Sequence, residues 1–259
     1  MNVVVFANQK GGTGKSTLSV LYALWLAERR GQRVGFIDLD SQGNASKTLR
    51  AHDYGYASRR LFGAGDTPGY APAPNKLVLF PADVALIDVE RMPPEEAIPV
   101  FRQRLGSLGE VLDVCVIDTP PALGLRMSAA LMAGTHVVCP IELEEYSIDG
   151  VTQMLQTVFG VRRKYNPALR LVGIVANRFN GHSVRQKLAL ADLLRSYREF
   201  VVPARISIRS AIPEGLAEGL PVWRLAKTSA REASEEILRV FELLQARIEK
   251  PSRSLREVA

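Results

Sequence analysis

The stretch KGGTGKST at residues 10–17 decides how this chain folds. Its residues are Lys10, Gly11, Gly12, Thr13, Gly14, Lys15, Ser16 and Thr17. An apolar run at 3–7 precedes the stretch and a helical pattern at 16–30 follows it, so the sequence predicts a strand, a glycine-rich loop and a helix in direct succession. In that order the loop amides and the positive end of the helix face one anion, which predicts a phosphate-binding loop.

Each residue type in the loop suits the phosphates of a nucleotide. Glycines allow backbone N–H groups to close around phosphate oxygens without interference from side chains. Lys15 is placed to reach the β- and γ-phosphates and the Ser16 hydroxyl to ligate Mg²⁺, so we predict that the chain binds ATP with Mg²⁺ and hydrolyses it. The competing interpretation is a glycine-rich turn that binds no nucleotide.

The loop departs from the general motif at two positions. Gln9 stands where the general motif has glycine, and a second lysine, Lys10, precedes the glycine pair. A cation beside the phosphates would neutralise charge on the γ-phosphate, much as an arginine finger does. The alternative for Lys10 is a solvated surface side chain.

Acidic residues stand at the ends of two further apolar runs. The run at 34–39 leads into Asp38-Leu39-Asp40, and the run at 114–117 leads into Asp118. Ligands of open α/β sheets bind beyond the carboxyl ends of the strands, so these acids should converge with the loop on one nucleotide. We expect Asp118 to hold Mg²⁺ through a bound water, and either Asp38 or Asp40 to position the attacking water. The alternative role for an acid at a strand end is a helix cap.

Apolar runs alternate with helical patterns along the rest of the chain. We expect strands at 3–7, 34–39, 77–80, 114–117, 136–141, 171–176 and 200–202, and helices at 16–30, 95–108, 125–132, 147–165, 184–197 and 229–248. Several strand runs are apolar almost throughout, as in parallel strands covered on both faces. The predicted fold is α/β, a doubly wound, mostly parallel sheet with helices on both faces. We expect a single P-loop ATPase domain at 1–250, a loop at 63–75 and a polar C-terminal tail at 251–259.

The composition narrows the class of protein. The chain has 259 residues, of which 47% are hydrophobic and 23% charged, and no apolar run approaches the roughly 20 residues of a membrane helix. The N-terminus lacks the pattern of a signal peptide, so we expect a cytoplasmic protein. Cys115 and Cys139 lie inside apolar runs, which favours buried thiols over a metal or redox role. The three histidines show no metal-ligand spacing.

Positive charge is concentrated in the C-terminal half. Residues 155–231 contain 14 Lys+Arg against 4 Asp+Glu, whereas the net charge of the whole chain is +6. This asymmetry indicates a polyanionic partner. A solvated basic face is the alternative.

Three motifs together resemble those of a known family. KGGTGKST at 10–17, IDLDSQGN at 37–44 and VIDTPP at 116–121 are similar to the deviant Walker A, A′ and Walker B motifs of the ParA/MinD ATPases. The segments DLDSQGN at 38–44 and IELEEYSIDGV at 141–151 favour the ParA branch, which partitions plasmids and chromosomes. The combination of LFGA at 61–64, IELEEYSIDG at 141–150 and GLPVWRLAKTSAREAS at 219–234 resembles the plasmid partition ATPases of the IncC type. The resemblance extends over residues 2–248.

The resemblance implies roles for individual residues. Members of the family bind ATP in a face-to-face homodimer, and Lys10 matches the lysine that contacts the nucleotide of the partner subunit. Lys10, Lys15 and Asp40 would then be the catalytic residues, with Asp40 orienting the attacking water. Asn177 matches the asparagine that reads the adenine, and the stretch around Pro203 would flank the base.

The resemblance also implies two macromolecular partners. The ATP-bound dimer of the family binds double-stranded DNA without sequence preference, which would place it on the nucleoid, and a ParB-type centromere-binding protein stimulates hydrolysis. Larger members carry an N-terminal helix-turn-helix domain, which we expect to be absent here because the first strand begins at residue 2. The candidate DNA-binding residues, each of which could instead be merely solvated, are Arg163, Lys164, Arg185, Lys187, Arg205, Arg209, Arg224 and Lys227, together with Arg162 and Arg231.

Three other functions compete with partition. A MinD-like regulator at the membrane surface would need a basic amphipathic C-terminal helix, but the polar face of the last predicted helix is rich in glutamate, so we expect it to pack on the sheet and expect no membrane partner. A reductase-like electron carrier would need exposed cysteines that bridge an iron–sulfur cluster. A positioning ATPase whose cargo is a protein assembly is hardly separated from partition by sequence.

Overall fold

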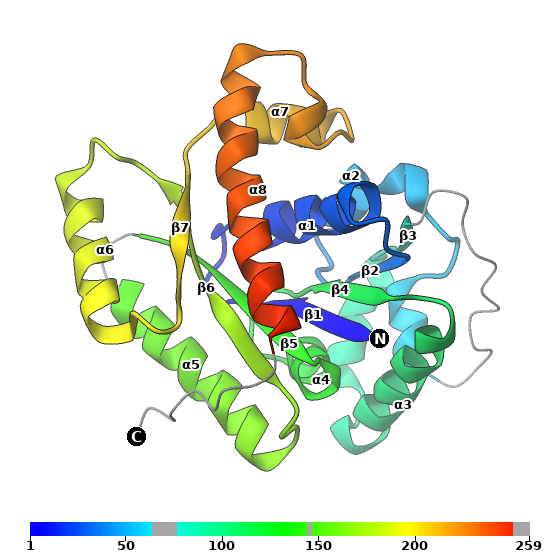
Figure 1. Ribbon diagram of the computed structural model, residues 1–259. Coiled ribbons are helices and arrows are strands. Elements are labelled where there is room, and N and C mark those ends of the chain that lie inside the picture. Colours follow the sequence, from blue (N-terminus) through cyan, green and yellow to red (C-terminus); the bar gives the residue numbers. More distant parts are fainter. Residues whose placement is uncertain (64–76, 144–146, 251–259) are drawn as a thin grey trace.

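The computed structural model describes residues 1–63, 77–143 and 147–250, which form a seven-stranded sheet with helices on both faces (Figure 1). The strands are β1 (Asn2–Phe6), β2 (Val34–Asp38), β3 (Leu77–Phe80), β4 (Val114–Asp118), β5 (His136–Glu142), β6 (Arg170–Phe179) and β7 (Val201–Ser207). Their order is β3-β2-β4-β1-β5-β6-β7, and every pairing is parallel. The predicted α/β fold is confirmed.

The helices cover the two faces of the sheet as separate layers. They are α1 (Lys15–Arg29), α2 (Asn44–Thr48), α3 (Pro94–Ser107), α4 (Leu125–Ala133), α5 (Ser147–Lys164), α6 (Val184–Tyr197), α7 (Ala211–Ala217) and α8 (Thr228–Glu249). Short 3-10 helices lie at Arg50–His52, Ser58–Phe62, Val84–Arg91, Leu108–Glu110 and Val222–Arg224. One apolar core lies between the sheet and α3, α4 and α5, and the other between the sheet and α1 and α8 (Figure 1).

Alternate residues of the central strands supply the two cores. In β4, Cys115 and Ile117 belong to the core under α3, α4 and α5, whereas Val114 and Val116 belong to the core under α1 and α8. Because side chains of a strand point alternately to opposite faces, a strand buried on both faces is apolar throughout. This arrangement explains why the apolar runs predicted the strands.

An aromatic contact joins α1 to α8. The ring of Tyr22 meets the ring of Phe241 edge-on at a centroid distance of 5.2 Å, and the Tyr22 hydroxyl donates to Gln245 Oε1 at 2.7 Å. Such a pair contributes about 1 kcal/mol beyond the burial of its area. The apolar stripe of α8 is buried against the sheet, so the predicted packing of this helix is confirmed.

Two helices escape prediction because they are short. α2 has five residues and begins after Gly43, and α7 has seven residues and contains Pro213 in its first turn. Neither is long enough for a helical period to emerge. β6 and β7 also run further than their apolar cores, to Phe179 and Ser207, because parallel pairing continues there. Residues 64–75 of the predicted loop and the whole predicted tail lie outside the described residues, and the division into one domain and a tail stays a prediction.

Both cysteines are buried, as expected, and burial raises the pKa of the Cys139 thiol to about 12. A buried, protonated thiol does not suit the exposed cluster ligand of an electron carrier. Among the described residues, no group of three His, Cys, Asp or Glu side chains is placed to hold a metal ion. No helix in that part of the chain has both the length and the apolar character needed to cross a membrane.

Candidate nucleotide site

The predicted nucleotide-binding residues gather at the carboxyl edge of the sheet. β1 lies between β4 and β5, so the loop that follows β1 emerges between the ends of its two neighbours. Across the sheet, Phe6 and Asp38 both pair with Asp118, and Glu142 pairs with Asn177. The parallel register therefore brings acids and an asparagine from distant parts of the chain next to one loop.

The phosphate loop is closed by hydrogen bonds of its own. Lys15 Nζ donates to the carbonyl oxygen of Lys10 at 3.0 Å, across the loop. Asn8 fixes the start of the loop, because its Oδ1 accepts from the Lys10 N–H at 3.0 Å and its Nδ2 donates to the Pro140 carbonyl at 2.7 Å. The loop thus has a defined shape with the amine of Lys15 turned inward.

Two glycines of the loop are required by its backbone. Gly12 and Gly14 have φ angles of 77° and 83°, in the left-handed region that favours glycine. A Cβ at Gly14 would also collide with the side-chain amide of Asn177. Asn177 is buried, and its Nδ2 donates to the Thr13 carbonyl at 2.9 Å. The end of β6 is therefore packed directly against the phosphate loop.

Asp118 is a buried carboxylate whose two oxygens accept no hydrogen bond within the described residues. Burial, and after it the carboxylate of Asp38, raises the pKa of Asp118 well above its ordinary value. The Ser16 hydroxyl, which lies beside it, and the Lys15 ammonium act in the opposite direction on that pKa. Buried charges are normally paired or coordinate a metal, and carboxylate and hydroxyl oxygens are ligands that Mg²⁺ prefers. Asp118 and Ser16 therefore fit a magnesium site.

The two acids after β2 have different surroundings. Asp38 is buried and accepts from the N–H and the hydroxyl of Ser46 (2.8 and 2.6 Å) and from the N–H of Asp40 (3.0 Å). Burial is the main reason why the pKa of Asp38 rises to about 6. The side chain of Asp40 is partly exposed and accepts from the Gln42 N–H at 3.0 Å. Asp38 thus fastens α2 to the end of β2, whereas Asp40 stays partly exposed.

The ammonium of Lys15 interacts both with the phosphate loop and with the carboxylates of Asp118 and Asp40. Its side chain is buried, and desolvation lowers the pKa of its ammonium, whereas the carboxylates of Asp118 and Asp40 raise that pKa. Because the carboxylates of Asp118 and Asp40 already offset the charge of Lys15, this lysine attracts a phosphate strongly only when a second cation offsets the two carboxylates. A phosphate bound together with Mg²⁺ would supply both the anion for Lys15 and the cation for the carboxylates.

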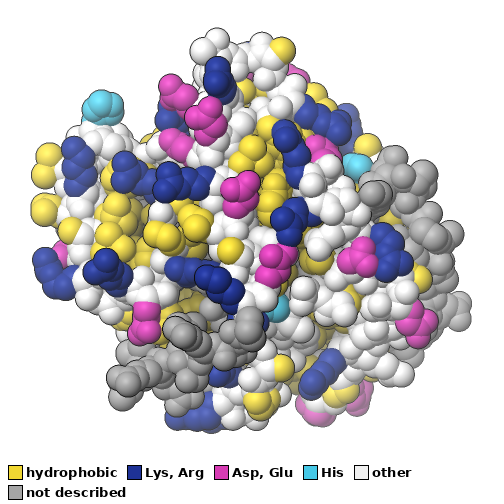
Figure 2. Space-filling view, in the orientation of Figure 1, with side chains coloured by type: hydrophobic (Ala, Val, Ile, Leu, Met, Phe, Trp, Pro, Cys, Tyr) yellow, Lys and Arg dark blue, Asp and Glu magenta, His cyan; other side chains and the backbone are white. Residues whose placement is uncertain are grey.

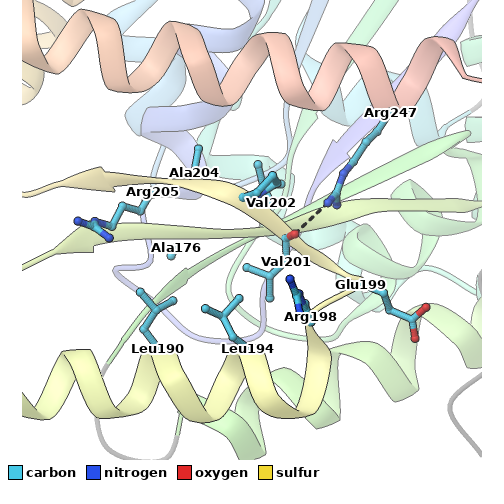
Figure 3. Close-up of a pocket in the computed structure, with 11 residues that line it drawn as sticks. Ala176, Leu190, Leu194, Arg198, Glu199, Val201, Val202, Ala204, Arg205 and Arg247 are labelled. Carbon is cyan, nitrogen blue, oxygen red and sulfur yellow. Dashed lines mark hydrogen bonds between the residues drawn. The ribbon is translucent and has the colours of Figure 1, made fainter.

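A pocket of about 660 Å³ opens beside the loop, a size typical of ligand sites. Gly14, Thr17 and Asn177 line it, as does the segment 207–213, which runs from the end of β7 into α7 and contributes all of its residues except Ala211. Pro203 does not reach this pocket. It lines a second pocket of about 760 Å³ between α6 and β7 (Figure 3). The structure therefore places residues 207–213, rather than Pro203, beside the loop.

Ion pairs occupy four of the ten candidate DNA-binding side chains. The pairs are Arg209 with Glu232 (2.6 Å) and Glu236 (2.8 Å), Arg224 with Glu28 (2.9 Å), Lys227 with Glu214 (2.7 Å), and Arg231 with Glu235 (3.3 Å). The glutamates hold the pKa of Arg209 and of Lys227 above their ordinary values. Their positive charges are thus locally balanced.

Other basic candidates are exposed. Arg163 and Lys164 lie at the end of α5, and Arg185 and Lys187 lie on α6. The guanidinium of Arg205 lies over the ring of Phe179 at 4.6 Å from its centroid. Figure 2 shows Lys and Arg side chains around an apolar strip between α6 and β7, and Figure 3 shows Arg198 and Arg205 at the pocket in that strip.

Sequence reasoning missed two residues of the site. Ser46 holds Asp38 through two hydrogen bonds, but a serine eight residues away on a short helix carries no recognisable signal. Arg178 lines the pocket beside the loop and follows Asn177 directly, so its position next to a predicted base contact was the available signal.

A glycine-rich loop between a central parallel strand and a helix, with buried acids at neighbouring strand ends, defines a P-loop ATPase. Residues 1–171 match a family model described as an AAA domain. The chain is 41% identical over 246 residues to protein IncC of Escherichia coli, covering 92% of this chain and 67% of that protein. It belongs to the ParA family of plasmid and chromosome partition ATPases.

A second relative agrees with this assignment, and a solved structure agrees with the fold. The chain is 32% identical over 247 residues to the chromosome-partitioning ATPase Soj of Thermus thermophilus, covering 92% of this chain and 96% of that protein. The structure superposes with a TM-score of 0.76 on cobyrinic acid a,c-diamide synthase of Mycobacterium smegmatis with bound ATP analogue and magnesium. That protein is 25% identical, and the match covers 96% of this chain and 94% of the other.

Proposed function

We propose that the chain binds ATP with Mg²⁺ as a homodimer, hydrolyses it, and in the ATP-bound state holds double-stranded DNA during partition. The observation that carries the nucleotide chemistry is the buried Asp118 carboxylate beside Ser16, which accepts no hydrogen bond within the described residues. A buried charge of this kind is unfavourable until a cation completes its surroundings. Membership of the family supports the partition role.

Nucleotide binding would rearrange the hydrogen bonds of the loop. The amides of residues 11–16 and the Lys15 ammonium would bind the phosphates, so Lys15 would exchange the Lys10 carbonyl for phosphate oxygens. The Ser16 hydroxyl would ligate Mg²⁺, and Asp118 would hold it through a bound water. A Mg²⁺ ion held by these two residues would supply positive charge that neutralises the phosphates.

We assign the positioning of the attacking water to Asp40. Asp38 already accepts three hydrogen bonds, which leaves it little capacity for a water, whereas Asp40 is partly exposed at the same edge of the sheet. Lys10 is exposed at the start of the loop, where it would contact the nucleotide of the partner subunit. Asn177 and residues 207–213 would hold the base in the pocket beside the loop.

ATP would act as a switch between states of the protein. A ligand shifts such an equilibrium only through its different affinities for the states. In the proposed dimer, the Lys10 of each subunit supplies that difference, because it contacts phosphate only across the dimer interface. Hydrolysis, stimulated by a ParB-type partner, would then release the dimer and the DNA.

The DNA-binding face would lie over α5, α6 and β7. Arg163, Lys164, Lys187 and Arg205 are exposed there and form no ion pair within the described residues, so their charges are available to phosphates. Before they could bind a phosphate, the side chains of Arg209, Arg224 and Lys227 would have to break their ion pairs with glutamates. Contacts of this kind carry no sequence preference and weaken steeply with salt. We accordingly propose a cytoplasmic protein that associates with the nucleoid.

Retention on DNA tests this function. Purified protein is passed over an arbitrary immobilised duplex with Mg²⁺ and ATP, ADP or a non-hydrolysable ATP analogue, at several salt concentrations. We expect retention with ATP and the analogue and release with ADP, each with a strong dependence on salt. Retention that is indifferent to the nucleotide would contradict the switch. No retention on DNA with any nucleotide would contradict the DNA-binding role and favour a positioning ATPase whose cargo is a protein assembly.

A further inference from the structure

Arg178 has an unfavourable backbone conformation beside the nucleotide pocket. Its φ is 53°, and among the described residues it is the one non-glycine with a positive φ. A side chain with a Cβ is disfavoured in this region, and such residues persist where the surroundings impose them, often at ligand sites. The position needs an explanation because glycine would adopt the same backbone freely.

The sheet changes register at this residue. The pairing of β6 with β7 shifts between Ala176 and Phe179, which brackets Arg178. An irregularity of this kind at the end of a strand redirects a side chain, and such irregularities are common next to active sites. Asn177, on one side of the irregularity, is fixed by its hydrogen bond to the Thr13 carbonyl. The backbone of Arg178 is therefore set by the contact between β6 and the phosphate loop.

The redirected side chain lines the nucleotide pocket. Arg178 lines this pocket together with Gly14, Thr17 and Asn177. Its Nε donates to Glu142 Oε1 at 3.2 Å, and the Arg178 side chain is 56% exposed while that of Glu142 is 18% exposed. An ion pair with one partner this exposed contributes little to stability, so it does not account for the unfavourable backbone.

We propose that Arg178 binds the base of the nucleotide by stacking its guanidinium on the base face, and that Glu142 holds the side chain in readiness until the base arrives. A guanidinium is planar and stacks well on aromatic rings. Asn177 would read the edge of the base while Arg178 covers its face. This inference rests on the proposed nucleotide binding and adds a contact to that site.

The test compares Arg178→Ala, Arg178→Gly and Glu142→Gln with the wild type by calorimetry. The titrants, each with Mg²⁺, are ATP, ADP and inorganic tripolyphosphate, which has no base. Arg30→Ala is the matched control, because Arg30 forms an exposed ion pair with Glu249 at 2.6 Å. We expect both Arg178 variants to bind ATP and ADP about tenfold more weakly, the effect of one base-stacking contact. Tripolyphosphate affinity should not change, and Glu142→Gln should bind ATP at least as well as the wild type.

Thermal unfolding separates this role from a structural one. Arg178→Gly should be more stable than Arg178→Ala, because glycine accepts the positive φ, yet both should lose the same affinity. Unchanged ATP affinity in both Arg178 variants would overturn the inference. An equal loss with tripolyphosphate would also overturn it, since the contact would then be to phosphate. If the wild type itself takes up no Mg·ATP, the proposed function fails instead.

Discussion

His136 should make the stability of this protein sensitive to acid. It is the first residue of β5, is buried, and has Nδ1 at 2.8 Å from the Thr135 hydroxyl and Nε2 at 3.5 Å from Arg170 Nη1. Burial, and secondarily the Arg170 cation, lowers the pKa of His136 from 6.5 to about 4. The unfolded chain therefore binds a proton that the folded chain excludes. The free energy of unfolding is therefore unaffected by His136 above pH 6.5 and decreases as the pH falls from 6.5 towards 4.

The perturbation is His136→Gln, which removes the titrating group. Between pH 7.5 and pH 4.5 a shift from 6.5 to about 4 corresponds to about 2.5 kcal/mol of unfolding free energy. Relative to His136→Gln, the wild type should lose this amount of unfolding free energy on acidification. Asp38, with its pKa raised to about 6, has the opposite sign in the same window, because its contribution is lost as the pH rises. It is common to both proteins and cancels in their difference.

Urea unfolding at four pH values between 4.5 and 7.5 measures this difference. The quantity of interest is the change in unfolding free energy of the wild type minus that of His136→Gln over the same interval. A proton NMR titration of the His136 ring in the wild type provides an independent pKa. Stability profiles that remain parallel within about 0.5 kcal/mol would refute the reasoning, because a histidine with an ordinary pKa in both states produces no slope.

Three further predictions concern the proposed function. Lys15→Ala should abolish tight binding of Mg·ATP in calorimetry. Lys10→Ala should leave ATP binding by the monomer intact and impair ATP-dependent dimerisation or stimulated turnover. If Lys10→Ala dimerises and is fully stimulated, the proposed role of Lys10 across the dimer interface is wrong. Asp40→Ala should bind ATP normally and hydrolyse it about 100-fold more slowly, as measured by phosphate release, because the attacking water loses its acceptor. Arg205→Ala should weaken ATP-dependent DNA retention more than Lys227→Ala, since Lys227 already pairs with a glutamate. If the two variants lose the same retention at both low and high salt, the ion pair of Lys227 does not reduce its contribution to DNA binding.

Short-range patterns in the sequence determined the fold and the phosphate loop. Strands buried on both faces have to be apolar along their whole length, and a loop that wraps phosphate needs glycines between a strand and a helix, so both features are contiguous in the chain. The position of Asp118 at the end of such a strand also placed it at the ligand edge of the sheet. These inferences needed no knowledge of which elements touch.

Tertiary structure decided the features that depend on contacts between distant segments. Asp38 and Asp40 are two residues apart and look alike in sequence. The structure distinguishes them, because Ser46 donates two hydrogen bonds to the carboxylate of Asp38 and none to that of Asp40. Residues 207–213 lie beside the loop and Pro203 does not, because β7 runs further along the sheet than its apolar core suggested.

The state of individual arginines is the clearest case of this dependence. Arg224 is neutralised by Glu28, nearly two hundred residues earlier, whereas Arg205 has no such partner among the described residues. The positive φ of Arg178 likewise occurs where the register of β6 against β7 shifts and β6 contacts the phosphate loop. Charge and residue type belong to the sequence, but pairing, burial and backbone angle are set by packing, which brings together groups that are far apart in the chain.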